Sequence, residues 1–212
     1  MRTSICSILR GYSPTLYLLG SVALNDFRPG WSDIDLLCLT EQSLSDEHAE
    51  ELLNLRQKLV QETSEPIYRL FECGFLSVRA LHTHTPDTVV YWGTSGQRLT
   101  DQYHFDSFCM VQMQTTGRLL CGEDIRTQFP MPSYTDLRND VIRHYQTIRK
   151  YAAQTDGSLY ACAWLLDIAR CLYTLKTGGV IAKTAAGEWA LVQRLCNVPD
   201  TLAKTIEVRS AC

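Results

Sequence analysis

The sequence predicts an α/β N-terminal half followed by an all-α C-terminal half. Up to about Pro130, short strand-like apolar runs alternate with longer amphipathic runs such as Asp46 to Gln61. After the Pro-rich segment from Phe129 to Ser133, the apolar residues recur only at helical spacing. We therefore expect two domains, over residues 1–130 and 131–212.

The first strand ends in a possible phosphate-binding turn. The run Leu16 to Leu19 is short and apolar, which is typical of a buried strand, and Gly20 and Ser21 follow it directly. Glycine lets the backbone come close to a ligand. The amides of Gly20 and Ser21 and the Ser21 hydroxyl could thus hold phosphate oxygens at the start of a short helix.

The second strand carries a pair of acidic residues. The run Asp33 to Leu39 reads as a strand, and its period of two puts Asp33 and Asp35 on one face and Ile34 on the other. Two neighbouring carboxylates repel each other unless a cation lies between them. Magnesium is the natural candidate, because one or two carboxylates and substrate phosphates usually hold it. The alternative is an ordinary solvated Asp-x-Asp pair.

A third acid interrupts a later strand-like run. Glu72 lies within the run Tyr68 to Phe75, which is otherwise mostly apolar. Near a magnesium site, Glu72 would be a third metal ligand or a general base. The alternative is a glutamate at a strand edge, paired with Arg69 or Arg79.

Two basic residues in the C-terminal half are candidates for binding phosphate. Arg170 lies inside an apolar helical run, where a guanidinium needs an anionic partner or solvent, and Lys183 opens the next helix. Positive charge there would stabilise a leaving pyrophosphate. The alternative for each is an ordinary salt bridge. The expected helices are Thr135 to Ala153, Leu159 to Lys176, Lys183 to Cys196 and one from Pro199.

Composition narrows the class of partner. A chain of 212 residues with 45% hydrophobic residues can form a sizeable core. A net charge of -3 provides no basic field for a polynucleotide, so we expect a small-molecule acceptor and no nucleic acid. No stretch approaches the length of a membrane span, so we expect no membrane partner.

The cysteines indicate a reducing compartment. The nine cysteines include no Cys-x-x-Cys pair, and most lie inside apolar runs. We expect free thiols and a cytoplasmic location. The N-terminus leads directly into the proposed site, so we expect no cleaved leader.

Two groups of residues resemble a known family. The order strand, Gly20-Ser21, helix and Ser32-Asp33-Ile34-Asp35 resembles the signature of the polymerase-beta-like nucleotidyltransferase superfamily. The segments Asp167 to Arg170, Tyr173 to Gly178 and Lys183 to Ala190 resemble the helical C-terminal domain of the streptomycin and spectinomycin adenylyltransferases. The resemblance implies a mixed sheet with flanking helices, followed by a helical bundle.

The resemblance also implies an activity and a role for each residue. The expected reaction transfers AMP from ATP, with two Mg²⁺ ions, to a hydroxyl of a small cationic acceptor of the aminoglycoside type. Asp33 and Asp35 would bind magnesium, with Glu72 as catalytic base and additional ligand. The residues expected to contact the nucleotide phosphates are Gly20, Ser21, Ser32, Arg170 and Lys183.

The expected acceptor residues match the family least well. An ungapped comparison with the family, extended toward the N-terminus from Arg170, places Tyr151, Asp156 and Tyr160 at positions that contact the acceptor. Of these three, only Asp156 keeps an acid that the family has there. Tyr160 stands where the family has an aspartate. Gly96 falls near the position at which the family has an aromatic residue. Asp156 is alternatively just a turn or helix-cap acid.

Other functions and assemblies stay open at this point. The acceptor could instead be a tyrosine of a partner protein, as in toxin-silencing nucleotidyltransferases, or the chain could be a silent nucleotide-binding module. The last expected helix ends abruptly at Cys212. We expect an apolar face there that a second copy could cover, which would give a homodimer.

Overall fold

The computed structural model describes residues 1–62, 64–85, 87–94, 96–101, 103–152 and 159–211. The chain divides into two compact units. The first unit comprises Met1–Ala23, Asp33–Phe105 and Met113–Pro130, and the second comprises Leu24–Ser32, Asp106–Gln112 and the chain from Met131 onward. The helical unit thus also includes two short segments that precede residue 130.

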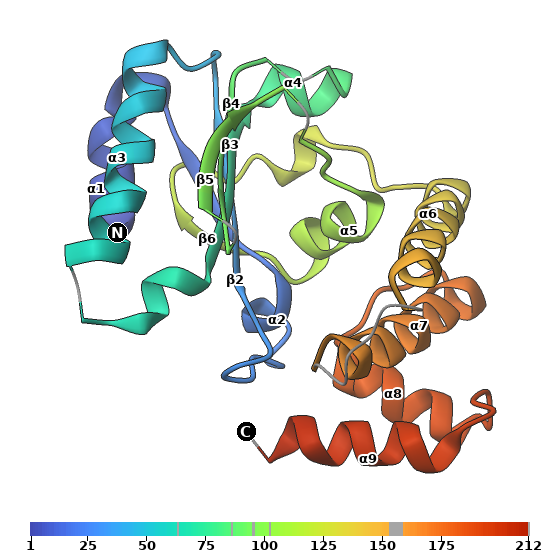
Figure 1. The fold of residues 1–212 in the computed structure, drawn as a ribbon. Coiled ribbons are helices and arrows are strands. Elements are labelled where there is room, and N and C mark those ends of the chain that lie inside the picture. Colours follow the sequence, from blue (N-terminus) through green and yellow to red (C-terminus); the bar gives the residue numbers. More distant parts are fainter. Residues whose placement is uncertain (63, 86, 95, 102, 153–158, 212) are drawn as a thin grey trace. The chain divides into compact units, whose positions relative to one another are not determined.

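A mixed sheet forms the centre of the first unit (Figure 1). In the described residues its strand order is β5-β4-β3-β2-β1-β6, with β2 and β3 parallel and the other neighbours antiparallel. This arrangement confirms the predicted mixed sheet. The strands are β1 (Thr15–Leu18), β2 (Ile34–Thr40), β3 (Phe71–Ser77), β4 (Val89–Gly93), β5 (Gly96–Thr100) and β6 (Arg118–Cys121).

Short and long helices connect these strands. In Figure 1, α1 and α3 lie side by side on one face of the sheet. The helices of this unit are α1 (Arg2–Ile8), α2 (Gly20–Ala23), α3 (Asp46–Glu62) and α4 (Val78–Thr83), with 3-10 turns at Arg10–Tyr12, Pro66–Leu70 and Arg126–Gln128. Helix α5 (Ser107–Thr115) passes from the second unit into the first.

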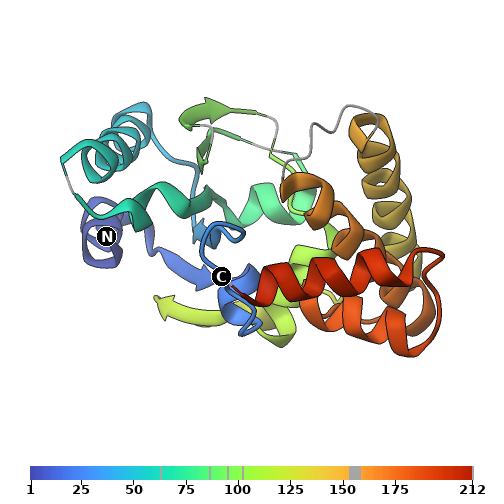
Figure 2. The same cartoon turned by 60° about the horizontal axis from the view of Figure 1, so that its bottom comes forward.

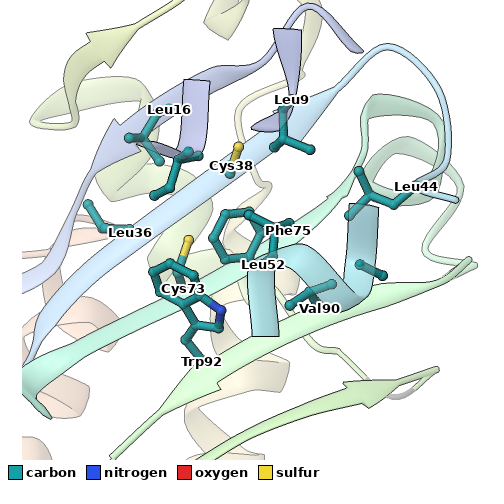
Figure 3. Packing of buried hydrophobic residues seen from close by; sticks show 12 residues of the cluster. Leu9, Leu16, Leu36, Cys38, Leu44, Leu52, Cys73, Phe75, Val90 and Trp92 are labelled. Atoms are coloured by element: carbon teal, nitrogen blue, oxygen red, sulfur yellow. The ribbon is translucent and has the colours of Figure 1, made fainter. Parts of the chain in front are cut away.

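One apolar core lies between the sheet and helices α1 and α3, and it shows which face of the sheet each strand residue occupies. Leu36 and Cys38 of β2 and Phe75 of β3 are buried in one apolar cluster together with Leu52 of α3 (Figure 3). Successive strand residues point to opposite faces. The odd-numbered residues of β2 and Glu72 of β3 therefore project from the opposite face of the sheet. That face is available for a catalytic site.

The third strand begins later than the sequence predicts. We expected a strand from Tyr68 to Phe75, but β3 starts at Phe71 and a 3-10 turn precedes it from Pro66. Proline has a fixed φ and no N–H donor, so it favours the first turn of a helix over the interior of a strand. Glu72 nevertheless lies in β3, as expected.

The second unit is helical, as predicted. Its helices are α6 (Tyr134–Ala152), α7 (Leu159–Thr177), α8 (Lys183–Val192) and α9 (Pro199–Ser210), and α7 packs against α8 and α9 (Figure 2). Helix α8 ends four residues before the predicted Cys196. Arg194 adopts a left-handed conformation (φ 53°), and the Leu195 N–H donates to the Ala190 carbonyl, a hydrogen bond typical of a Schellman helix end.

One cysteine pair differs from the expectation of free thiols. Cys6 in α1 and Cys121 in β6 are paired as a disulfide, with their Cα atoms 7.4 Å apart, which is beyond the usual disulfide range. The expectation is wrong for this pair. The free cysteines of the described residues are Cys38, Cys73, Cys109, Cys162, Cys171 and Cys196. In the same part of the chain, no helix combines the length and apolar character needed to cross a membrane.

Candidate active site

The predicted acidic residues meet on the sheet face opposite α1 and α3. Asp35 of β2 lies directly beside Glu72 of β3 in the parallel register. Asp33 precedes β2 by one residue. Burial raises the pKa of Tyr91, and the negative charges of Glu72 and Asp33 raise it further, so both acids lie near that phenol. Asp35 and Glu72 are thus direct neighbours at the N-terminal end of β2, and Asp33 lies close by in the chain.

The predicted Gly-Ser turn packs against the same two aspartates, Asp33 and Asp35. The Leu19 N–H donates to the Asp35 carbonyl (2.8 Å), and the Ser21 hydroxyl donates to the Asp33 carbonyl (3.2 Å). Gly20 has a left-handed φ of 61°, and a Cβ there would overlap Oδ2 of Asp35. Glycine is therefore needed both for its backbone conformation and for the close approach to Asp35.

We expect Gly20→Ala to lower both stability and activity. An alanine must adopt the left-handed conformation, at about 1–2 kcal/mol, and must displace the Asp35 carboxylate. Urea denaturation and a nucleotide-transfer assay measure the two effects. Gly11→Ala is the matched control, because nothing lies within 4 Å of a Cβ there and its φ is not in the left-handed region. Equal stability and activity of the two variants would contradict the role of Gly20.

Glu72 does not form the salt bridge that was its alternative interpretation. Its Oε1 accepts hydrogen bonds from the backbone N–H and the hydroxyl of Thr94, both at 3.2 Å. Arg79 pairs with Asp87 instead (3.6 Å). The hydrogen bonds from Thr94 to the Glu72 carboxylate thus come from neutral donors, while the buried Arg56 lies near enough to Glu72 to interact with its charge.

The donor set suits magnesium in part. Carboxylate oxygens are the ligands that magnesium prefers, and Asp33 and Asp35 supply them beside a turn suited to phosphate. Over the described residues, no group of three His, Cys, Asp or Glu side chains converges as a metal site. Two aspartates with phosphate oxygens would suffice for magnesium. Glu72 as a further ligand stays a prediction.

The two predicted basic residues come together in the second unit. Arg170 of α7 and Lys183 of α8 each lie 3.0 Å from a different oxygen of Asp167. Burial opposes the charge of Asp167, but the two cations outweigh it and lower its pKa. One carboxylate facing two cations leaves a net positive charge, which suits a phosphate. Phosphate binding by this pair stays a prediction.

Ser32 lies in a buried network of the second unit. Its hydroxyl accepts hydrogen bonds from the Arg28 N–H (3.0 Å) and the Arg209 guanidinium (3.4 Å). Arg209 also pairs with Asp26 (3.2 Å), whose carboxylate accepts from the Thr184 N–H in the first turn of α8. The Ser32 hydroxyl thus has partners within the protein, and its predicted contact with phosphate stays a prediction.

Two of the three predicted acceptor residues, Tyr151 and Tyr160, lie at the end of α6 and at the start of α7. Tyr151 is in the last turn of α6 and is 46% exposed, and the Lys150 ammonium lies 5.2 Å from the centroid of its ring. Asp156 lies outside the described residues. Tyr160 is in the first turn of α7, and its side chain is likewise outside the description.

Sequence reasoning missed several residues around Glu72. Tyr91 lies across from Gly74 in the antiparallel register of β3 and β4, and Tyr103 packs so closely on Gly74 that a Cβ would overlap its ring. A glycine inside a strand is the signal that could have indicated this close approach. Around Thr94 the signal was weaker, because the aromatic and turn-forming residues from Tyr91 to Gly96 suit a loop that lines a cleft and a simple packing corner equally well.

The fold and this site define the class of protein first. A mixed sheet whose Gly-Ser turn contacts strand aspartates is the arrangement of a nucleotidyltransferase, and residues 2–77 match the family model described as a nucleotidyltransferase domain. Residues 130–208 match the C-terminal domain of aminoglycoside adenylyltransferases. Together these matches span most of the chain, which thus combines a nucleotidyltransferase domain with the C-terminal domain of the aminoglycoside adenylyltransferases.

A solved structure has the same fold. Spectinomycin adenyltransferase AAD(9) from Enterococcus faecialis, crystallised with ATP and spectinomycin, superposes with a TM-score of 0.72. The comparison covers 98% of this chain and 86% of that one, at 16% identity. A search of curated proteins finds no match to the sequence.

Proposed function

We propose that this protein is a magnesium-dependent adenylyltransferase that transfers AMP from ATP to a hydroxyl of a small cationic acceptor of the aminoglycoside type. The observation that carries this proposal is the parallel register of Asp35 and Glu72 beside the Gly20-Ser21 turn. It places an acid suited to metal-nucleotide binding next to an acid suited to proton abstraction. The match to the C-terminal domain of the adenylyltransferases and the ATP in the solved relative support the nucleotide.

Each of these residues would have its own role in the transfer of AMP. Asp33 and Asp35 hold magnesium, which when bound neutralises charge on the triphosphate. The Gly20 and Ser21 amides contact a phosphate, and Glu72 accepts the proton of the acceptor hydroxyl as that oxygen attacks the α-phosphorus. Arg170 and Lys183 stabilise the negative charge of the leaving pyrophosphate. The P–O bond to pyrophosphate breaks as the new one forms.

The choice of acceptor rests on the similarity to the aminoglycoside adenylyltransferases and not on any contact in this structure. The solved relative was crystallised with spectinomycin, so spectinomycin and streptomycin are the first acceptors to test. Three carboxylates near the expected reacting hydroxyl would attract a cationic antibiotic. We propose a cytoplasmic location on the need for ATP and on the cysteines that stay free, while the Cys6–Cys121 disulfide argues against it.

We expect pyrophosphate release from magnesium-ATP to depend on one of these antibiotics. Glu72→Gln should lower kcat by about 10²–10⁴-fold, because it removes a general base while keeping the shape of the side chain. Coupled detection of pyrophosphate and mass spectrometry of the antibiotic measure both effects. Glu50→Gln, on the exposed surface of α3, is the matched control.

The same assay can overturn the proposal. ATP binding without release on any antibiotic would favour a protein acceptor or a silent nucleotide-binding module. Labelled ATP with cell lysate would then separate these two, since only the first labels a protein.

A further inference from the structure

Glu72 needs more than its strand to act as a base. The parallel pairing with β2 fixes its backbone beside Asp35. Three rotatable side-chain bonds still separate that backbone from the carboxylate, and a misplacement of about 1 Å can cost about 100-fold in rate. Whatever holds the carboxylate therefore affects catalysis directly.

Thr94 supplies two donors to one oxygen of that carboxylate. It follows β4 at the tip of the β4-β5 hairpin, where Gly93 pairs with Gly96. Its N–H and its hydroxyl both donate to Oε1 of Glu72 at 3.2 Å. This two-point contact restricts rotation about the last side-chain bond of Glu72. It also leaves Oε2 outside the contact with Thr94, as the oxygen that can take a proton.

Tyr91 also lies beside Glu72. It comes from the same hairpin, on the same sheet face as Glu72, and lies across from Gly74. The Tyr91 phenol donates a hydrogen bond to the Glu72 carboxylate. The Arg98 guanidinium lies 4.5 Å from the ring centroid and packs against its face. The hairpin thus presents several donors to one carboxylate.

The exposure of Thr94 indicates that its hydrogen bonds orient Glu72 more than they stabilise the fold. Thr94 is exposed, and hydrogen bonds at exposed positions contribute little to the free energy of unfolding. A donor pair that stabilises the fold little but restricts a reactive carboxylate is explained by function more readily than by folding.

We propose that Thr94 is a positioning residue that orients Glu72 for proton abstraction, with Tyr91 as a second support from the same hairpin. This inference rests on the proposed role of Glu72 as the base. It assigns the tip of the β4-β5 hairpin to the catalytic machinery, a segment that carries no recognisable motif.

The decisive test compares Thr94→Val with Thr94→Ser. Valine keeps the shape and the backbone donor but removes the hydroxyl, so we expect kcat to fall about 10–100-fold. The dissociation constant for ATP should change less than about twofold, since the nucleotide contacts are elsewhere. Serine should restore kcat to within about threefold. Thr85→Val is the matched control, since its exposed hydroxyl donates only to the nearby Thr83 carbonyl.

Two outcomes would overturn this inference without touching the proposed function. If Glu72→Gln is inactive while Thr94→Val has the kcat of the wild type, Glu72 is the base and Thr94 does not position it. The same conclusion follows if serine is as slow as valine. If Glu72→Gln is fully active, the proposed base itself is wrong and the inference falls with it.

A measurement without any acceptor tests the contact itself. The Thr94 amide should exchange its hydrogen faster in Glu72→Ala than in the wild type, and its NMR resonance should move, because its acceptor is gone. An unchanged Thr94 amide would show that the contact does not exist in solution, and would overturn the inference.

Discussion

Asp35→Asn is expected to lower kcat/KM for nucleotide transfer by about 1,000-fold or more. The substitution keeps the size of the side chain, which Gly20 contacts closely, but removes one of the two negative charges that would hold magnesium. A 1,000-fold loss corresponds to about 4 kcal/mol of transition-state stabilisation, which is within the range of a lost metal contact. Pyrophosphate release at saturating magnesium measures it.

The same variant should not be less stable. Asp35 lies beside Glu72 in register, and two like charges side by side destabilise the fold when no cation separates them. Asp35→Asn removes this repulsion, so its melting temperature without magnesium should equal or exceed that of the wild type. The exposed Asp200→Asn in α9 is the control. A large loss of stability in Asp35→Asn would indicate a structural role instead.

The sequence predicted those parts of the fold that depend on local patterns. The Gly-Ser turn and the acidic strand were readable because strand periodicity and the conformational freedom of glycine act over a few residues. The helical second half was confirmed for the same reason, whereas the mixed sheet, also confirmed, was predicted from the family resemblance. The start of β3 was misjudged because Pro66 acts against the strand pattern of the residues that follow it.

Of the candidate site, the sequence indicated the Gly-Ser turn and the acidic residues but not the contact between Thr94 and Glu72. Asp35 and Glu72 each interrupt an apolar strand, and this is a local signal. Thr94 is an ordinary turn residue until pairing of β4 with β3 brings it to Glu72. The partners Asp26 and Arg209 lie 183 residues apart, so no local pattern could have joined them.

Arg209→Met is expected to lower the free energy of unfolding of the second unit by about 3–5 kcal/mol. The Arg209 and Asp26 side chains are only 2% and 6% exposed, so removal of one leaves the other charge buried. Arg209 also donates to the Thr184 hydroxyl (3.1 Å), which in turn donates to Asp26 (2.6 Å), so one substitution breaks a network. Urea denaturation followed by circular dichroism measures the loss.

The same helix offers the control that separates burial from charge. Lys204 and Glu207 form a salt bridge of 3.0 Å in α9, but their side chains are 66% and 69% exposed. Solvent screens such a pair, so Lys204→Met should cost less than about 0.5 kcal/mol although it removes the same charge. If the two methionine variants were equally stable, the buried network would not hold the 24–32 segment to α8 and α9. If only Arg209→Met is destabilised, the segment that leads into Asp33 owes its order to the C-terminal helix. Truncations that remove α9 should then destabilise this segment as well.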